Sequence, residues 1–319
     1  MKFPPVLKNT LIGAICITAT ACSHIGIKGN TSAVVTTTYL TESVQRRLSD
    51  MDVVVVGENH DNKIHHEIQL EVIQRLHQAD RLGQVIFEHL NEQQAADFNR
   101  AANCNPSKKC GQAELNALLQ WEESHWPDFD MFYPIFAFLK ENNIPVIAGH
   151  IDRNALMSLY KGESPELISP ENRQKIPLDK ALPTKAEQAL VERIRDSHCG
   201  MLNDQHAKAM LPLQRYRDGY MAAQYLAHQD NTHKTTVYLL GNGHAREDYG
   251  VPYYLRSAIP NLKIHAIQLE EGDSSDFKIL QQTASGSYFE HIIATPTQER
   301  DDPCENADKQ FNKYTKKAR

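Results

Sequence analysis

Histidines and carboxylates gather where the most apolar segments of the chain end. The stretch VVVVGENHDNKIHH, residues 53–66, runs from four valines into Glu58 and His60. A second apolar segment ends in Glu88 and His89, and a later one, YLLGNGHAR, ends in His244. Imidazoles exchange protons near neutral pH, and imidazoles and carboxylates both bind transition ions. These residues therefore predict a polar or metal-binding site.

Two kinds of chemistry fit these side chains. Neutral imidazoles and glutamates bind Zn, Mn or Fe, and a metal-activated water would make a hydrolase that uses Glu58, His60, Glu88 and His244. Alternatively, the same groups form a polar pocket that orients part of a larger ligand. A hydrogen-bonded network that only stabilises strand ends explains any one histidine. Two Gly-x-x-His turns together with both glutamates favour a functional site over that explanation.

His65 and His66 stand at the start of a predicted helix. The helix dipole disfavours a cation at that end, so a neutral imidazole that contacts ligand or backbone would fit there. Two solvated surface histidines are the simpler expectation for this pair.

The apolar runs predict an α/β fold with a mainly parallel central sheet flanked by helices. Expected strands are 53–56, 84–89, 145–150, 235–240, 262–269 and, with a weaker pattern, 287–293. Expected helices between the first strands are 43–50, 64–77, 92–102, 114–124 and 129–142. Strands that alternate with helices at this spacing form βαβ units. The carboxyl ends of such strands share one edge, where open α/β sheets bind ligands.

A helical insertion is expected between the third and fourth of these strands. Residues 152–230 contain no convincing strand and carry helical patterns at 153–160, 185–198 and 204–229. We expect this insertion to cover the carboxyl ends of the strands.

The N-terminus is typical of an exported bacterial lipoprotein. Residues 1–21 combine two lysines with a short apolar run at 11–18, which is far below the ~20 residues that span a bilayer. Small residues stand directly before Cys22, the candidate lipidation site; an ordinary signal peptide cut near Ala21 is the alternative. Ser23 replaces the Asp associated with inner-membrane retention, so an outer-membrane protein that faces the periplasm or the surface is expected.

An exported lipoprotein would have a tether, a folded domain and a tail, and its cysteines could form disulfides. Residues 22–42 would form a tether, 43–295 the domain and 296–319 a polar, loose tail. Cys104 and Cys110 bracket a polar loop and predict a local disulfide, with a metal clip as the rival. Cys199 and Cys304 are either a long-range pair or two free thiols. The net charge of -6 argues against a nucleic-acid partner.

Several motifs resemble those of the ChaN-type haem-binding lipoproteins, which share a superfamily with Tiki proteases, TraB proteins and erythromycin esterases. These motifs are GENHDN, IFEHL, WPDFDMFYP, RDSHCGML, RYRDGYMA, GNGHAREDYGVP and DDPC, and they span residues 53–304. The resemblance implies a homodimer that encloses two stacked haems, with a lipid anchor in the membrane. It also implies that one tyrosine holds each iron, that a partner histidine lies near a propionate, and that an outer-membrane receptor supplies haem.

The resemblance leaves the iron ligand open among Tyr133, Tyr216 and Tyr220. The other expected haem-binding residues are His198, Arg217 and Arg246; the arginines would meet propionates or simply pair with nearby aspartates. Tyr216, Tyr220 and two methionines of the same segment would line a porphyrin slot or pack as an ordinary helix. The leading hypothesis is a non-catalytic lipoprotein for haem or iron acquisition or storage. A metal-dependent hydrolase or protease is the alternative, and such a site could persist beside a haem slot.

Overall fold

The computed structural model describes residues 38–101, 111–163, 165–229, 233–272, 278–281, 288–302 and 304–305. The expected signal peptide, Cys22, most of the tether and the Cys104–Cys110 pair lie outside these described residues. The chain divides into two units, residues 1–32 and residues 33–319, and every described element belongs to the second. Among the described residues, no helix is both long and apolar enough to cross a membrane.

A seven-stranded sheet forms the centre of the second unit, with strand order β3-β2-β4-β1-β5-β7-β6. Neighbouring strands are parallel except β6, which runs antiparallel to β7. The strands are β1 (Val53–Glu58), β2 (Leu82–Phe87), β3 (Val146–Ala148), β4 (Thr235–Gly241), β5 (Ile264–Gly272), β6 (Lys278–Gln281) and β7 (His291–Pro296). The predicted α/β class with a mainly parallel sheet is confirmed.

The valine run forms an inner strand because both of its faces are covered. Val54 and Val56 pack into one apolar cluster, while Val53 and Val55 pack into a second cluster on the other face. All four are fully buried, as a continuous β-branched run in a parallel sheet predicts. The sheet therefore holds residue 58 at a fixed place on its carboxyl edge.

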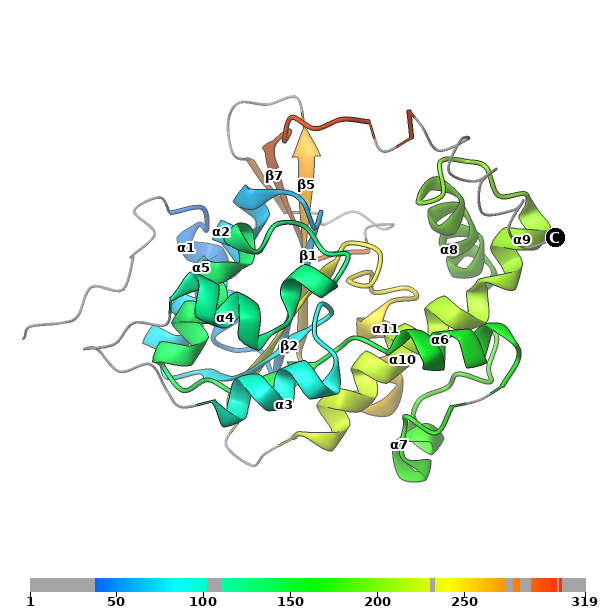
Figure 1. The fold of residues 1–319 in the computed structure, drawn as a ribbon, viewed down its shortest axis with the longest axis horizontal. Helices are drawn as coiled ribbons and strands as arrows, with labels where there is room; N and C mark the ends of the chain where they lie inside the picture. The colour runs from blue at the N-terminus through cyan, green and yellow to red at the C-terminus, as the bar shows by residue number, and fades with distance from the viewer. Residues whose placement is uncertain are drawn as a thin grey trace, which may run out of the picture. The chain divides into compact units, whose positions relative to one another are not determined.

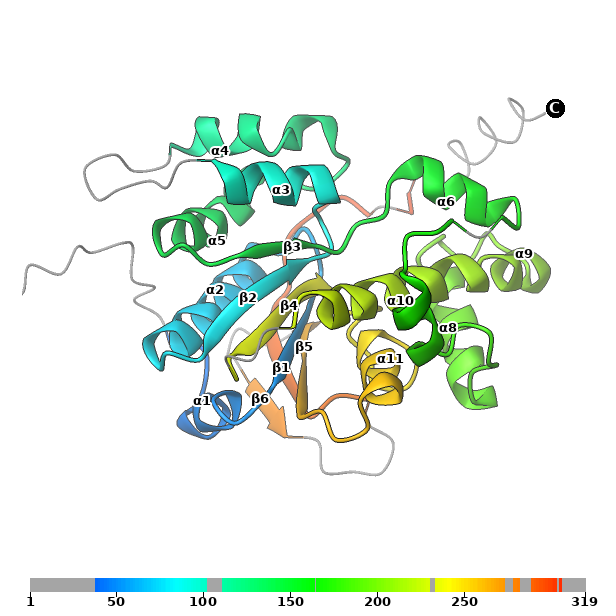
Figure 2. The same cartoon turned by 90° about the horizontal axis from the view of Figure 1, so that it is seen from below.

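One layer of helices covers the face that includes Val54 and Val56. Figure 2 shows these helices on one side of the sheet. They are α1 (Glu42–Leu48), α2 (Lys63–Gln78), α3 (Glu92–Arg100), α4 (Gln112–Leu118), α5 (Phe129–Glu141) and the short 3-10 helix η1 (Trp121–Glu123). Asn62 starts α2 directly after the first site turn, because its Oδ1 accepts from the backbone N–H groups of Ile64 and His65 at 2.9 and 3.2 Å.

The helical insertion supplies most of the opposite layer. Its helices are α6 (Arg153–Tyr160), α7 (Pro170–Lys175), α8 (Thr184–Asp196), α9 (Asp204–Ala209) and α10 (Leu211–Ala227), and α11 (Val251–Ala258) joins them. The Tyr238 hydroxyl of β4 donates to the Met221 carbonyl of α10 at 2.9 Å, so α10 lies against the sheet. Figure 1 shows α8 and α9 side by side; they pack in a third apolar cluster with Tyr249.

Three boundaries differ from the expectation for local reasons. The helix expected at 114–124 ends at Leu118, since Gln120 takes a left-handed backbone with φ of 50° before η1. The helix expected at 204–229 is two helices. Pro212 has no backbone N–H and fits only a first turn, where α10 begins. The last expected strand, 287–293, is observed as β7, and α7, α11 and β6 were not expected.

The edge strand β3 is partly covered by a side chain. Asn99 of α3 accepts from the Val146 N–H through Oδ1 at 3.0 Å. Its Nδ2 donates to the Val146 carbonyl at 2.7 Å. The amide thus occupies both hydrogen-bonding groups of the first residue of this edge strand.

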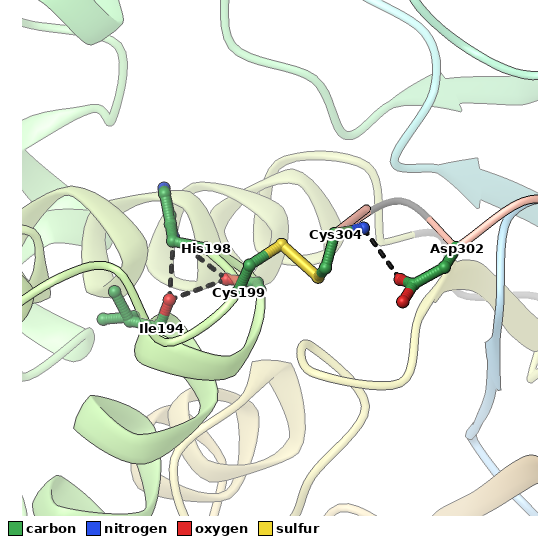
Figure 3. Close-up of a disulfide and its surroundings, with 6 residues drawn as sticks. Ile194, His198, Cys199, Asp302 and Cys304 are labelled. Atoms are coloured by element: carbon green, nitrogen blue, oxygen red, sulfur yellow. Dashed lines mark hydrogen bonds between the residues drawn. A yellow bond between two sulfur atoms is a disulfide. The ribbon is translucent and has the colours of Figure 1, made fainter. Parts of the chain in front are cut away.

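The described residues directly after β7 are attached to the domain, whereas residues 306–319 of the predicted loose tail lie outside the described residues. Cys304 forms a disulfide with Cys199 in the turn after α8 (Figure 3). Arg300 pairs with Asp61 at 2.8 Å and also with Glu271. Of the two alternatives for Cys199 and Cys304, the structure contains the long-range pair.

Candidate functional site

The two Gly-x-x-His turns pack directly against each other at the carboxyl edge of the sheet. A Cβ atom on Gly57 would lie 2.6 Å from Asn242 Oδ1 and 2.8 Å from Ala245 Cβ. Such distances are too short for nonbonded atoms, so the first turn needs glycine for this contact. The neighbouring pairing of β1 and β4 brings these turns together, as their similar sequences predicted.

His60, Glu88 and His244 meet around Gly241. Glu88 Oε2 accepts from the Gly241 N–H at 2.7 Å, and His244 Nε2 lies 3.2 Å from Glu88 Oε1. A Cβ atom on Gly241 would lie 3.0 Å from His60 Nε2 and 3.6 Å from Glu88 Oε2. The expected convergence of these side chains, with Glu58, is therefore present at one edge of the sheet.

Glu58 is the centre of a buried group of three histidines. Its Oε1 lies 2.8 Å from His60 Nδ1 and 3.0 Å from His89 Nε2. Its Oε2 lies 3.1 Å from His66 Nδ1. Glu58, His60 and His89 each offer one candidate ligand atom, and these three atoms lie within 4.8 Å of one another. A bound metal ion would bring them closer, to metal–ligand distances.

The Trp126 ring covers part of this group. The Trp126 ring centroid lies 4.9 Å from that of His60 and 4.5 Å from that of His89. Trp126 Nε1 also donates to the His89 carbonyl at 3.0 Å. The His89 and His66 side chains are 0% and 1% exposed, whereas that of His60 is 33% exposed. A ligand or substrate would therefore meet His60 before the others.

Glu88 belongs to a second buried group that includes residues of α10. His244 Nδ1 lies 2.5 Å from Asp218 Oδ1, and Arg217 Nη2 lies 3.6 Å from Glu88 Oε1. The sequence indicated Asp218 only as a pairing partner for Arg217, whereas it placed His89 with Glu88 among the residues of the predicted site. In α10, Asp218 is buried together with Tyr216, Gly219 and Tyr220.

The buried charges of the site stabilise one another. Burial raises the pKa of Glu58, but the charge of His66 and the bonds from its histidines hold that pKa well below its usual range. Burial also raises the pKa of Glu88, but the charges of His244 and His60 hold that pKa well below its usual range. Burial lowers the pKa of His244, but Glu88 and Asp218 raise it to about 9. Two ionised carboxylates and a protonated His244 are thus the stable state at neutral pH.

His65 and His66 are buried in α2, so the expectation of two solvated surface histidines is wrong. Both lie on the face of α2 that packs on the sheet. His65 Nδ1 accepts from the Asn59 N–H at 2.9 Å, while its Nε2 contacts Thr295 Oγ1 at 2.9 Å. Burial lowers the pKa of His65 to about 4. The neutral imidazole that contacts backbone, the other alternative, is present.

Tyr216 and Tyr220 point into the protein. The Tyr216 hydroxyl donates to the Pro165 carbonyl at 2.5 Å, and the Tyr220 hydroxyl donates to Glu92 Oε1 at 3.0 Å. Both rings pack with Met221 in the second apolar cluster, and burial raises the pKa of each hydroxyl. These contacts are ordinary helix packing, which is the alternative to a porphyrin slot.

The other expected haem residues lie in different parts of the domain. Tyr133 of α5 packs against the cluster on the opposite face of the sheet. Arg246 forms two hydrogen bonds with Asp248 at 3.0 and 2.8 Å. His198 Nδ1 donates to the Ile194 carbonyl at 2.7 Å beside the disulfide (Figure 3). Arg217 is the member of the expected haem set that contacts the Glu88 group.

A surface group that the sequence did not single out lies in the helical insertion. Among the described residues, the exposed large hydrophobic side chains are Met157, Tyr160 and Leu167, at 45%, 67% and 38% exposure. Two belong to α6, and the third follows it in the chain. The segment LMSLY offered a signal, since it is apolar on more sides than a helix packed on one face requires. We name these three residues the α6 patch.

Comparison with known proteins identifies the family. Residues 44–255 match the family described as haem-binding uptake, Tiki superfamily, ChaN. No curated protein sequence matches the chain. The fold is similar to that of ChaN of Campylobacter jejuni, solved with cofacial haem binding. That comparison has 18% identity and a TM-score of 0.58, and it covers 79% of this chain and 90% of that one.

Two further solved structures match the chain with lower similarity. The type III effector HopBA1 has 14% identity and a TM-score of 0.43, with 80% of this chain and 92% of that chain covered. An erythromycin esterase, the EreC mutant in its open conformation, has 12% identity and a TM-score of 0.43, with 85% and 81% covered. The family match spans most of the described domain, so the chain belongs to the haem-binding uptake family ChaN of the Tiki superfamily.

Proposed function

We propose that this chain binds haem at the bacterial cell envelope, for haem or iron acquisition or storage. The observation that carries the proposal is the family match over residues 44–255. The haem-bound ChaN from Campylobacter jejuni, which has a similar fold, supports it.

The α6 patch fits the chemistry of haem. A porphyrin has two flat apolar faces and two carboxylates, so it needs exposed apolar contacts beside cations. Met157 and Tyr160 supply such contacts on α6, and Leu167 follows. Arg153 and Lys161 are exposed at the two ends of the same helix, where they can meet propionates.

Tyr160 is the tyrosine that we propose as the iron ligand. When bound, haem supplies a ferric iron that a hard phenolate oxygen stabilises. The Tyr160 side chain is 67% exposed, so its hydroxyl can reach a ligand. By contrast, Tyr216 and Tyr220 already donate to protein oxygens and are buried, which makes each a poorer candidate. Tyr133 remains a candidate on the opposite face of the sheet.

We also propose that the chain forms a homodimer and that it is anchored to the outer membrane. A haem on an exposed helix has one face open, and a second copy of this chain would cover it; His198 would then lie near a propionate of the partner's haem. Arg217 and Arg246 remain candidates for further propionate contacts. Lipidation of Cys22 would attach the protein to the outer membrane, where a haem receptor would be the donor.

Hemin titration of the mature chain, with Cys22 replaced to prevent lipidation, tests the haem proposal. We expect a shifted Soret band and high-spin ferric-tyrosinate features that saturate at stoichiometric hemin. Tyr160→Phe should abolish these features while Tyr133→Phe, Tyr216→Phe and Tyr220→Phe keep them. Loss in one of those three variants instead would assign the iron to that tyrosine. No spectral change at micromolar hemin would overturn haem binding itself.

A metal-dependent hydrolase is the second candidate function, and one observation favours it. Glu58, His60 and His89 bring three ligand atoms within 4.8 Å, and His60 is partly open to solvent. Glu88 and His244 lie next to this group and would position or activate water. The ion would be Zn, Mn or Fe, which nitrogen and carboxylate ligands suit.

Metal content and chelator-sensitive hydrolysis of generic peptide or ester substrates decide this second candidate. A bound transition ion together with activity that His60→Asn removes would support it. A metal-free protein with no activity under added Zn²⁺, Mn²⁺ or Fe²⁺ would contradict it without affecting the haem proposal.

A further inference from the structure

A second group of histidines and a glutamate lies at the opposite end of the strands from the site described above. His265 is the second residue of β5 and pairs in register with Val54, near the start of β1. His291 is the first residue of β7, and Glu290 directly precedes it. The three side chains offer ligand atoms that all lie within 4.8 Å of one another.

The contacts within this group form a chain. Glu290 Oε2 contacts His265 Nδ1, and His265 Nε2 lies 3.0 Å from His291 Nδ1. The two ring centroids are 4.8 Å apart. His265 is fully buried and His291 is 8% exposed, whereas the Glu290 side chain is 31% exposed.

The carboxylate fixes which nitrogen of His265 can bind a metal. A carboxylate accepts a proton, so His265 carries its hydrogen on Nδ1 and presents a lone pair on Nε2. That lone pair faces His291 Nδ1. A carboxylate that holds one ring nitrogen while the other binds metal is the usual support of a metal-ligating histidine.

The distance between the two nitrogens also suits an ion. Zinc binds imidazole nitrogen at about 2.0–2.1 Å with tetrahedral angles, which places two such nitrogens about 3.3 Å apart. The observed separation of 3.0 Å needs a small opening to reach that value. We propose that His265 and His291 bind one divalent transition ion of the zinc class, with Glu290 orienting His265.

Two side chains hold the Glu290 carboxylate in place. One is His265, and the other is Arg47 of α1, whose Nη2 lies 3.4 Å from Glu290 Oε2. The negative charge of the Glu290 carboxylate would offset part of the charge of an ion bound by the two imidazoles.

The position would place the ion between two strands of the sheet. Residues 265 and 267 of β5 share one face of the sheet, because side chains alternate along a strand. Ile267 of that face belongs to the cluster under α1 and α2. An ion held by His265 and His291 would join β5, β7 and, through Glu290, α1. This role is independent of haem and of the hydrolase alternative.

Equilibrium dialysis of the chelator-treated mature chain against Co²⁺, with Zn²⁺ competition, tests the inference. The His60→Asn background removes binding at the other site, and visible absorption reports nitrogen ligation. We expect one Co²⁺ per chain, displaced by Zn²⁺, and lost in His60→Asn/His291→Asn. Glu290→Gln in the same background should weaken binding roughly 10- to 100-fold.

Three results would overturn the inference. One is the absence of saturable Co²⁺ or Zn²⁺ binding in the His60→Asn background at micromolar concentrations. Another is binding that His291→Asn leaves unchanged. A third is full-strength binding in Glu290→Gln, which keeps both imidazoles and protects the test if the histidine variant fails to fold.

Discussion

Asp218 of α10 forms a buried ion pair with His244, the last residue of the second Gly-x-x-His turn, and their Oδ1 and Nδ1 atoms are 2.5 Å apart. Both side chains are nearly inaccessible to water, at 0% and 7% exposure. The pair joins the helical insertion to the edge of the sheet. The insertion and the site therefore depend on each other for their positions, and this dependence can be measured.

Removing the charge of Asp218 should destabilise the domain. Asp218→Asn removes one of the two buried carboxylates that hold the protonated His244, and breaking a buried ion pair costs roughly 3–5 kcal/mol. Urea unfolding followed by circular dichroism measures the loss. The matched control is Asp204→Asn, which breaks the exposed pair with Arg195 and should cost less than about 1 kcal/mol. Equal effects in both variants would contradict the importance of the Asp218–His244 pair.

Stability should fall as the pH rises through the pKa of His244. The pKa is about 9 in the folded state, against about 6.5 in the unfolded chain, so the folded state binds this proton more tightly. The stabilisation is fully present below pH 6.5 and is lost between pH 6.5 and 9, up to about 3 kcal/mol. Unfolding free energies across this range test it. His244→Gln should flatten the profile, and an unchanged slope in this variant would argue against the raised pKa.

His65 should make the domain less stable as the pH falls, which is the opposite of the dependence expected for His244. Its pKa is about 4 when folded, so the neutral ring stabilises the domain above pH 6.5, and this stability is lost as the pH falls towards 4. Protonation would remove the lone pair that accepts from the Asn59 N–H. His65→Gln should lose this part of the acid dependence, as unfolding at pH 7 and 4.5 will show. His77→Gln, at the partly exposed end of the same helix, should behave as the wild type.

Adding one methyl group at Gly241 should disturb the site. Gly241→Ala places a Cβ atom 3.0 Å from His60 Nε2, so His60 must move or the turn must shift, at a cost of roughly 1–3 kcal/mol. Chemical shifts of the His60 ring and unfolding curves report both effects. Gly272→Ala is the control, because no atom of the residues that the structure describes lies within 4 Å of its added Cβ. An unshifted His60 in Gly241→Ala would contradict the close packing of the two turns.

Reduction of the Cys199–Cys304 disulfide should lower the melting temperature. The bond closes a loop with a sequence separation of 105, and native disulfides typically contribute about 2–5 kcal/mol. Melting with and without a reductant measures the change. The double variant Cys199→Ser/Cys304→Ser should melt at the reduced temperature and respond little to reductant. A wild type that melts equally with and without reductant would contradict this contribution.

The fold was predictable because it depends on local patterns. Four valines, buried on both faces, predict an inner parallel strand, and Gly57 and Gly241 predict turns at its carboxyl edge. The convergence of Glu58, His60, Glu88 and His244 follows from the parallel arrangement of their strands, whose carboxyl ends share one edge of the sheet.

The partners from helices were not predictable in this way. Asp218 contacts His244 because of the way α10 packs over the sheet. His66 contacts Glu58 because the packing of α2 turns that side of the helix towards β1. Tyr216 and Tyr220 carry the residue type of an iron ligand, yet the same packing of α10 buries both hydroxyls. Helix orientation depends on the packing of whole faces, which spacing along one segment does not encode.

The amide of Asn99 protects the start of the edge strand β3. Because it already satisfies the N–H and the carbonyl of Val146, another chain cannot add a strand there by backbone pairing without displacing it. Self-association by sheet extension is thereby blocked at the start of β3. A second copy that approaches this part of β3 would therefore meet side chains, and a contact of that kind can dissociate without unravelling either sheet.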